Sequence, residues 1–393
     1  MLSEGERARA ASHEEVLDRV RALTAGIREG AAAAEEARNI SRDSAEALLG
    51  AGIARILVPP RFGGYGLGFD TWFEVLREIG KADASHSWCA GLMICHAYWV
   101  GLFAEEAQKA VWADGVDIGI ASSILPHGNV AAVKGGFNVS GQFPFSSGIN
   151  HSQWVILGGM VESDVGPQLT LFLLGPGKCK VVDTWNTAGM RATGSNTVVC
   201  HDVFVPTSHT VRISDLAEGS APGGSLYENP IYRAPLFSYA PLGFVAPMLG
   251  AAQGAYEMFR EWTKARRNAL GVPLSGLTSI QVRMARAAAD LDAAELLLRR
   301  VAEIAQAPTK PSLELRARAM RDTSRASEMC IDVIDTLIAM SGTAGFVATH
   351  PIQRAWRDIH FASMHIALNS EMNFSHFGRC ELGLPREPHQ MAY

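Results

Sequence analysis

One short stretch of the chain places polar groups that could do chemistry among aromatic side chains. Residues 141–154 read GQFPFSSGINHSQW, with adjacent Ser146 and Ser147, His151, three aromatic rings and no acidic or basic side chain beyond the imidazole. Hydroxyl and imidazole groups in such a setting can hydrogen-bond to a bound molecule or exchange protons with it. The alternative interpretation is an ordinary β-turn that His151 caps.

Further residues with this potential lie far away in the sequence. His96 falls in an almost uncharged stretch, 83–103, that also holds Trp88 and Trp99. A helix without a polar face is expected to be buried. A single buried histidine is commonly a core residue bonded to a backbone carbonyl, so His96 alone does not indicate a function. The same potential belongs to three residues elsewhere: Ser122, Ser123 and His365.

Groups that could bind a phosphate occur at two places. The segment MRATGS contributes Arg191, Thr193 and Ser195, which together with backbone N–H groups suit an anion. The second place is a basic cluster whose alternative interpretation is a solvated helix face. It consists of Lys264, Arg266 and Arg267. Neither a GxGxxG nor a Walker A pattern occurs, so we expect no nicotinamide site in this chain.

Three kinds of sequence must position these residues. Residues 1–116 show the apolar spacing of helices. Residues 117–228 hold short β-rich runs divided by Gly, Pro and Asn, which predict an antiparallel barrel or sandwich. From 229 to 393 long helical segments return, and their lengths predict a four-helix bundle. They are residues 241–267, 278–306, 312–340 and 351–373. We therefore expect an α+β, mainly α, protein, with a large cofactor in the crevice between its domains.

Composition argues against several classes of protein. The net charge of −5 is small and evenly spread, so nucleic acid is not an expected partner. No uncharged apolar run reaches the ~20 residues that span a bilayer, and the N-terminus lacks the apolar core of a signal peptide. The six cysteines form no Cys-x-x-Cys pair, so we expect no disulfide framework, no metal site and a cytoplasmic location.

Four segments together resemble the landmarks of the acyl-CoA dehydrogenase superfamily, in that family's order. They are residues 58–85, 139–154, 185–206 and 352–360, and the most specific is W-x-x-x-G-M-R-x-T-x-S at 185–195. The resemblance extends through nearly the whole chain. It implies an N-terminal helical domain (1–116), a central β-barrel domain (117–228) and a C-terminal four-helix bundle with its tail (229–393).

The sequence departs from that superfamily where its catalytic base should be. Acyl-CoA dehydrogenases remove an α-proton from a thioester with a glutamate. In one branch this glutamate lies nine residues beyond the arginine of the R-D motif. Counting from Arg357, that place holds Ile366, with His365 beside it. In another branch it lies early in the first long helix, but residues 234–255 contain no acidic residue. An alkyl side chain cannot accept a proton, so dehydrogenation by this route is not expected.

The histidine at this position is similar to the pattern in the oxygenase components of two-component flavin-dependent monooxygenases. The resemblance implies reduced FMN or FAD from a separate NAD(P)H:flavin reductase. It further implies reaction with O₂ to a C4a-hydroperoxide and hydroxylation of a small phenolic or related aromatic substrate. A flavin hydroperoxide needs a dry, uncharged pocket. That need accounts for the uncharged setting of Ser146 and Ser147, and Phe143, Phe145 and Trp154 are expected to exclude water.

The resemblance implies a role for each matching residue. Ser147, or else Ser146, would donate to flavin near N5. His365 would be the base for the phenolic hydroxyl, and His96 would hold that hydroxyl or donate to the peroxide. The expected substrate contacts are Trp88, Ser122, Ser123 and Ile366. The expected cofactor contacts are Ser147, Phe145, Gly148, Arg191, Thr193, Ser195 and Arg267.

Alternatives remain at the level of chemistry and assembly. The same fold could oxygenate an amine nitrogen or a thiophene-like sulfur, act as an acyl-CoA dehydrogenase or oxidase, or bind a flavin or small molecule without catalysis. Residues 278–306 are rich enough in alanine for close helix packing, and together with the low charged fraction of 19% they predict a homotetramer. The tail at 386–393 could cover a neighbour's pocket or be disordered.

Overall fold

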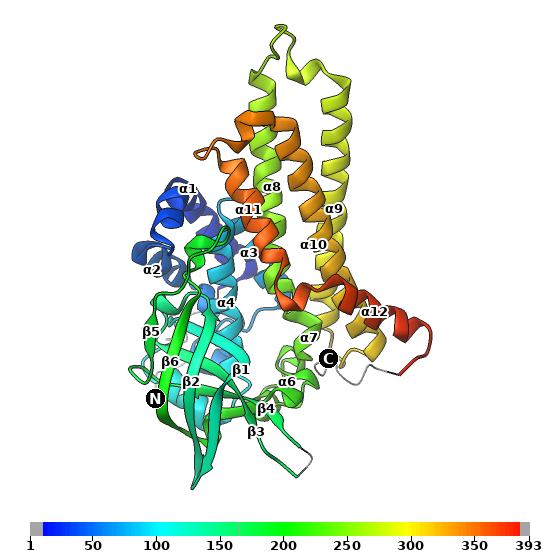
Figure 1. Ribbon diagram of the computed structural model, residues 1–393. Coiled ribbons are helices and arrows are strands. Elements are labelled where there is room, and N and C mark those ends of the chain that lie inside the picture. The colour runs from blue at the N-terminus through cyan, green and yellow to red at the C-terminus, as the bar shows by residue number, and fades with distance from the viewer. Residues whose placement is uncertain (1–10, 165, 386–393) are drawn as a thin grey trace.

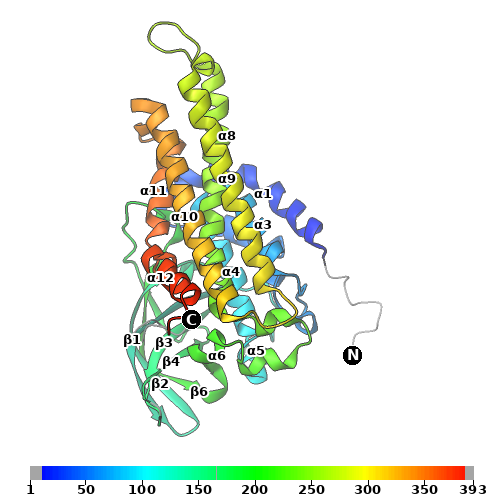
Figure 2. The ribbon, with the colours of Figure 1, turned by 90° about the vertical axis from the view of Figure 1, so that its right-hand side faces the viewer.

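The structure is a computed structural model that describes residues 11–164 and 166–385, so the tail at 386–393 lies outside the described residues. A group of helices, one sheet and a second group of helices follow one another along the chain (Figure 1). The long helices extend beyond the other two parts, and the tip between α8 and α9 projects from the rest of the molecule (Figure 2). The protein is mainly helical, and the boundaries of its three predicted domains stay a prediction.

The N-terminal helices surround one uncharged helix, α4 (Ala84–Val100). The others are α1 (His13–Ala37), α2 (Arg42–Gly50), α3 (Phe69–Gly80) and α5 (Glu105–Val111). All residues of α4 except Leu92 are buried, as its lack of charge predicts, and Asp83 caps its first turn by accepting from the N–H of His86. It packs against α3, α8 and strand β1. Residues of α4 therefore lie where the parts of the molecule meet.

The β-rich segment forms one seven-stranded sheet in the order β5-β6-β2-β1-β3-β4-β7. Its strands are β1 (Ile120–Val133), β2 (Gly136–Ser146), β3 (Trp154–Val161), β4 (Gln168–Leu174), β5 (Lys180–Val182), β6 (Asn196–Pro206) and β7 (Thr210–Arg212). The predicted antiparallel barrel is wrong in two respects, because the described sheet is not closed and β1 pairs in parallel with β3. The chain reverses direction between β1 and β2 and again between β2 and β3. Because β3 lies beside β1, the two strands run parallel.

After the short helices α6 (Ile213–Ala217) and α7 (Leu236–Tyr239), the long helices pack along one another. They are α8 (Leu242–Ala265), α9 (Thr278–Ala305) and α10 (Leu313–Ser341), with α11 (Pro351–Ser363) against α8 and α10. The single helix expected at 351–373 is wrong, because α11 ends at Ser363 and α12 (Ser370–Glu381) begins after a break. His365 and Asn369 stabilise the break by accepting backbone N–H groups of Ala367 and Met372.

The C-terminal half of α10 is long and apolar enough to cross a membrane, judged by length and composition alone. In the structure its apolar residues Val333, Ile334 and Leu337 are fully buried in the main hydrophobic core. The helix packs against α8, α9, α11 and α12. One face of this segment thus lies in the core, while 39% of its most apolar stretch is buried.

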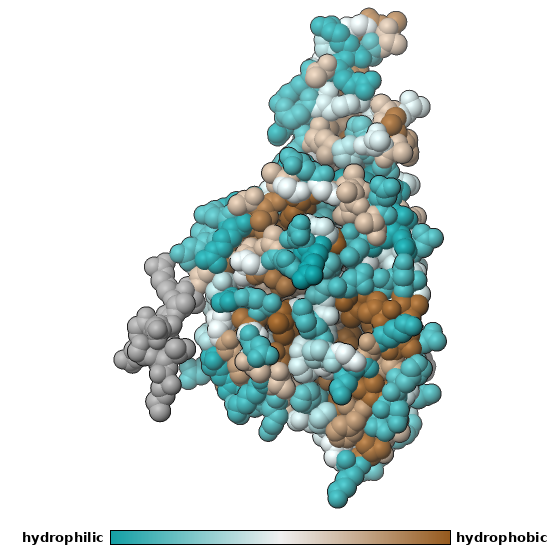
Figure 3. All heavy atoms as spheres, turned by 90° about the vertical axis from the view of Figure 1, so that its left-hand side faces the viewer, coloured by the Kyte–Doolittle hydropathy of each residue, from teal (hydrophilic) through white to brown (hydrophobic). Residues whose placement is uncertain are grey.

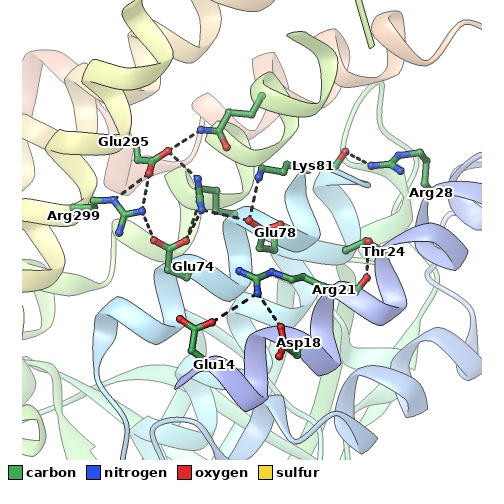
Figure 4. A network of polar contacts seen from close by, with 12 residues as sticks. Glu14, Asp18, Arg21, Thr24, Arg28, Glu74, Glu78, Lys81, Glu295 and Arg299 are labelled. Atoms are coloured by element: carbon green, nitrogen blue, oxygen red, sulfur yellow. Dashed lines mark hydrogen bonds and ion pairs between the residues drawn. The ribbon is translucent and has the colours of Figure 1, made fainter. Parts of the chain in front are cut away.

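A network of ion pairs joins helix α3 to helices α8 and α9 (Figure 4). Glu74 contacts Arg77 at 2.6 Å and also pairs with Arg299. Glu295 on α9 accepts from Arg77 at 2.9 Å, from Arg299 at 2.7 Å and from Gln253 of α8 at 2.9 Å. Shared partners of this kind hold the acidic and basic groups in one geometry, so the network fixes the N-terminal helices against the long ones.

Candidate active site

A cavity of about 440 Å³ lies where α4, the sheet, the start of α8 and the α11–α12 break meet. Most of its wall is apolar and aromatic, contributed by residues such as Trp99, Leu236 and Phe361. None of the described residues that line it carries an acidic, lysine or arginine side chain. The polar groups that face it are two histidines and a few hydroxyls, so they can exchange protons and hydrogen bonds in a dry setting.

His96 and Ser122 form a hydrogen-bonded pair in the wall of this cavity. His96 Nδ1 lies 2.7 Å from the carbonyl oxygen of Ile120, which can only accept, so Nδ1 carries the proton. Nε2 is then an acceptor, and the Ser122 hydroxyl, 2.9 Å away, donates to it. Burial lowers the pKa of His96 to about 4, which keeps the ring neutral near neutral pH. His96 is therefore a neutral, weak base whose acceptor nitrogen is reached through the Ser122 hydroxyl.

The neighbouring Ser123 has a different environment. Ser123 also lines the cavity, but its hydroxyl donates to the carbonyl of Pro144 at 2.6 Å, and the residue is 7% exposed. Because successive side chains of a strand point to opposite faces, Ser122 and Ser123 cannot both join His96. The structure thus favours Ser122 from this predicted pair.

Ser147 heads a row of hydroxyl groups. Its Oγ accepts from Trp88 Nε1 at 3.3 Å and lies 2.6 Å from Ser195 Oγ, which lies 2.6 Å from Thr193 Oγ1. Thr193 in turn donates to the carbonyl of Met190 at 2.8 Å. By contrast, Ser146 is fully buried, does not line the cavity and has no hydrogen-bond partner for its hydroxyl. The geometry favours Ser147 from this pair as well.

Phe145 stands beside the serines in a backbone conformation that costs energy. Its φ is +65°, yet it is not glycine, and its ring is 64% exposed and edge-on to Trp185 at 6.1 Å. Such a conformation in a bulky residue is uncommon and tends to occur at functional sites. The exposed ring and its strained backbone support the prediction that Phe145 contacts a bound cofactor.

His365 lies in the break between α11 and α12. Its ring stacks on Phe244 with centroids 3.8 Å apart and meets Trp88 edge-on at 5.7 Å. Its Nδ1 accepts from the N–H of Ala367 at 3.2 Å, so the proton of the neutral ring is on Nε2. Burial lowers its pKa to about 4. Ile366 next to it also lines the cavity but is 52% exposed, which places it at the rim.

The R-D motif, Arg357-Asp358, holds the W-x-x-x-G-M-R segment in place through backbone hydrogen bonds. Asp358 accepts from the backbone N–H of Met190 at 2.6 Å, and Arg357 donates to the carbonyl of Ala188 at 2.7 Å. A Cβ on Gly189 would lie 2.3 Å from the Arg357 carbonyl, so only glycine fits. Burial and the neighbouring Asp83 raise the pKa of Asp358 to about 7. These contacts hold Met190 and Thr193 in the cavity wall.

Several predicted residues do not line the cavity. Arg191 donates to the Thr187 carbonyl, Gly148 bonds through its N–H to the Thr193 carbonyl, and His151 contacts the Ile40 carbonyl. Arg267 lies at the projecting tip after α8 and donates to Gly271, so within one chain it is far from the cavity. The predictions that Arg191, Gly148 and Arg267 contact a cofactor gain no support from this single chain.

Sequence reasoning missed two contributors to the site. Phe244 provides the stacking surface of His365, and Trp185 contacts the rings of both Phe145 and Phe361. Phe244 lies in the stretch without acidic residues at 234–255, so its apolar character was visible but its partner was not. Only the break after α11 brings it against His365.

Comparisons with known proteins agree with this geometry. Residues 10–116 match the family model "Acyl-CoA dehydrogenase, N-terminal domain" and residues 242–370 match "Acyl-CoA dehydrogenase, C-terminal domain". The flavin-dependent monooxygenase, oxygenase subunit HsaA, of Rhodococcus jostii is 36% identical, over 94% of this chain and 98% of that protein. The FADH(2)-dependent resorcinol hydroxylase, oxygenase component, of a Rhizobium species is 32% identical over 95% of each.

A solved structure extends the likeness to three dimensions. The crystal structure of 3-HSA hydroxylase from Rhodococcus has a TM-score of 0.90 and 35% sequence identity, and covers 96% of this chain and 99% of its own. The resemblance in sequence motifs is therefore confirmed. The chain belongs to the acyl-CoA dehydrogenase superfamily and, within it, to the oxygenase components of flavin-dependent monooxygenases.

Proposed function

We propose that this protein, using reduced flavin and O₂, adds one oxygen atom to the ring of a neutral phenolic or related aromatic substrate. The observation that carries the proposal is a mainly apolar cavity in which the neutral pair His96–Ser122 and His365 are the imidazole groups available to a phenol. An acyl-CoA dehydrogenase would need a carboxylate base, and no described acidic residue lines the cavity.

The residues around Ser147 fit a flavin. The Ser147 hydroxyl has a lone pair left for a ring N–H, and Phe145 offers an exposed aromatic face beside it. When bound, reduced FMN or FAD supplies the electrons and the activated oxygen atom.

The row of three hydroxyls gives Ser147 two hydrogen-bonding states. With Thr193 donating to Met190, the protons run from Ser147 through Ser195 to Thr193, and Ser147 acts as an acceptor toward the cavity. If all three hydroxyls rotate, the order reverses and Ser147 becomes a donor. The Met190 carbonyl still accepts from Trp185 Nε1 at 3.0 Å, so the reversal leaves it bonded. Ser195 and Thr193 would thus decide whether the Ser147 hydroxyl acts as a donor or as an acceptor toward the flavin edge.

The proton of a phenolic substrate would pass to His96 by way of Ser122. The Ser122 oxygen would accept the phenol proton while its own proton moves to His96 Nε2, which already accepts it. Because the pKa of His96 is lowered, the proton would move as the ring is attacked, when the phenolic hydroxyl becomes far more acidic, and this transfer favours hydroxylation. The sequence assigned the base role to His365. We instead propose a donor role for His365, because its Nε2 carries the proton in the neutral ring.

The wall of the cavity favours a substrate without formal charge. A carboxylate moved into an apolar wall without a cationic partner loses its hydration with nothing to replace it. No described lining residue is a lysine or arginine. We therefore expect neutral phenols to be accepted and ring acids such as hydroxyphenylacetate to be rejected.

A partner protein and a larger assembly complete the proposal. An NAD(P)H:flavin reductase would supply the reduced flavin, since relatives carry the designation oxygenase subunit or component. Figure 3 shows apolar side chains on the face that lies to the left in Figure 1, and on α9, which lies to the right there, Leu296 is 68% exposed. These surfaces, with the low charged fraction, support a homotetramer. The proposed location is the cytoplasm.

The test is a substrate screen with the purified protein and a flavin reductase. Neutral phenols should give products heavier by one oxygen atom, with either FMN or FAD, and matched carboxylated phenols should give peroxide instead. Anaerobic bleaching of a tightly bound oxidised flavin by an acyl-CoA thioester would contradict the proposal. If only a nitrogen or sulfur atom gained oxygen and no phenol were converted, the protein would still be a flavin-dependent monooxygenase, but the proposed substrate class would be wrong.

A further inference from the structure

Two cysteines far apart in the sequence face each other across the edge of the sheet. Strand β5 pairs antiparallel with β6, and Lys180 lies opposite Val199. Extending this register by one residue places Cys179 opposite Cys200. Opposite residues of antiparallel strands have Cα atoms about 4.5–5.5 Å apart, which lies within the range of disulfide-bonded cysteines. If the register continues to Cys179, the backbone has the spacing of a disulfide.

The side chains of the pair also meet. Cys200 is buried at 1% exposure in the second hydrophobic cluster, and Cys179 packs against the same cluster while keeping partial access to solvent. The two thiols shift each other's pKa, downward for Cys179 and upward for Cys200. Because Cys179 keeps partial access to solvent and Cys200 is buried, Cys179 is the sulfur that an oxidant reaches first.

The remaining cysteines lack this combination. Burial raises the pKa of Cys89 and of Cys330 to about 12, and it raises the pKa of Cys95 as well. Such thiols are inert toward oxidants. Cys380 is partly exposed but lies on α12, away from the sheet. It therefore serves as a control for simple exposure.

We propose that Cys179 and Cys200 are a dithiol site that hydrogen peroxide converts reversibly to a disulfide. The Cys179 thiolate would attack one peroxide oxygen, the O–O bond would break, and one water would leave after protonation, giving a sulfenic acid on Cys179. The Cys200 sulfur would then attack that sulfur, lose its proton, and displace a second water. Two thiols are oxidised and one peroxide is reduced to two waters. A thiol reductant reverses the reaction.

The disulfide would leave the active-site cavity in place. Thr184 and Trp185, which follow β5, are already bonded to Asn196 Oδ1 at 3.0 and 3.1 Å, and Asn196 begins β6. The new bond would join the same two segments a few residues away. The site therefore protects Cys179 from irreversible oxidation without closing the cavity, and added peroxide tests it independently of any flavin chemistry.

The test treats the full chain with a slight excess of hydrogen peroxide and maps its peptides by mass. We expect a Cys179–Cys200 linkage, lighter by two hydrogens and reversed by dithiothreitol, with Cys179 lost roughly tenfold faster than Cys380. In Cys200→Ser, Cys179 should proceed to sulfinic acid, and in Cys179→Ser, Cys200 should stay reduced. The inference is overturned if Cys179 in the unaltered protein becomes sulfinic acid without a linkage. It is equally overturned if both thiols stay reduced when Cys380 is oxidised.

Discussion

At the scale of single residues, the direction of each hydrogen bond decides what His96 and His365 can do. Both rings are neutral near neutral pH, because burial lowers each pKa to about 4. The carbonyl of Ile120 makes His96 Nε2 an acceptor, which Ser122 occupies, while the N–H of Ala367 makes His365 Nε2 a donor. The family resemblance implied two functional histidines, but only their backbone partners distinguish the roles.

Ser122→Ala should lower the rate of hydroxylation about 100-fold, because the phenol loses its path to His96. Flavin binding should be unchanged. The matched control is Ser123→Ala, whose hydroxyl bonds to Pro144 instead. Steady-state product formation and a flavin titration check this. Equal losses of hydroxylation rate in the two variants would show that proton transfer through the His96–Ser122 pair does not contribute to the reaction.

Ser147→Ala should increase the share of consumed O₂ that is released as hydrogen peroxide, because the flavin edge loses its hydroxyl partner. Ser146→Ala is the control: its hydroxyl is buried without a partner, so removing it should leave coupling and stability unchanged or slightly improved. Peroxide and product are measured in the same reaction. If Ser146→Ala uncouples the reaction and Ser147→Ala does not, the assignment is reversed.

Burial of His96 should make the protein less stable in acid. The folded-state pKa of about 4 lies below the ordinary 6.5, so the unfolded chain binds the proton first as pH falls. Stability is therefore full above pH 6.5 and decreases toward pH 4, by roughly 3 kcal/mol for this ring. Urea unfolding across this range should show that much less pH dependence in His96→Asn. An identical pH dependence would mean that His96 is not buried as a neutral ring.

At the scale of elements, the break between α11 and α12 and the ion network are the features that position the site. The break turns His365 onto Phe244, and the network fixes α3, which packs on α4, against α9. Within the network, Arg299 and Arg77 outweigh the burial of Glu295 and lower its pKa. Its contribution to stability is therefore present above the ordinary carboxyl pKa and is lost as the pH falls through the folded value.

Glu295→Gln should lower the free energy of unfolding by about 1–3 kcal/mol, because two arginines lose a shared carboxylate. The exposed pair Arg325–Glu328 supplies the control, and Glu328→Gln should cost under about 0.5 kcal/mol. Denaturant unfolding of both variants measures this. Equal small effects would mean that the network does not hold the helices together.

Part of the architecture was readable from the sequence for a physical reason. Apolar spacing predicted the long helices, and the uncharged run predicted the buried helix α4, because periodicity reports which face avoids water. The break after Ser363 was not readable, since 364–369 contain neither glycine nor proline and the caps come from His365 and Asn369. The parallel β1–β3 pair was not readable either, because pairing between distant strands leaves no local signal.

At the scale of the whole molecule, the residues of the cavity come from every part of the chain. This explains why motifs separated by hundreds of residues had to be taken together before they indicated a function. It also leaves the tip after α8, with Arg267, away from the cavity of its own chain. Contact between that tip and another subunit depends on the assembly.

We expect the protein in solution to have four times the chain mass of 42.2 kDa. Light scattering on a size-exclusion column measures this mass directly. Leu296→Asp, which puts a charge on the exposed face of α9, should shift the protein toward smaller species because that face is predicted to be covered. A monomer at all concentrations would contradict the predicted tetramer without affecting the chemistry of the cavity.

The central claim is that the cavity directs an oxygen atom from O₂ onto a neutral aromatic ring. The most direct measurement supplies reduced flavin and ¹⁸O₂ to the protein with a neutral phenol and determines the mass of the product. We predict one ¹⁸O atom per molecule of hydroxylated product. An unlabelled product, or consumption of all the oxygen as hydrogen peroxide with every neutral phenol, would contradict the account.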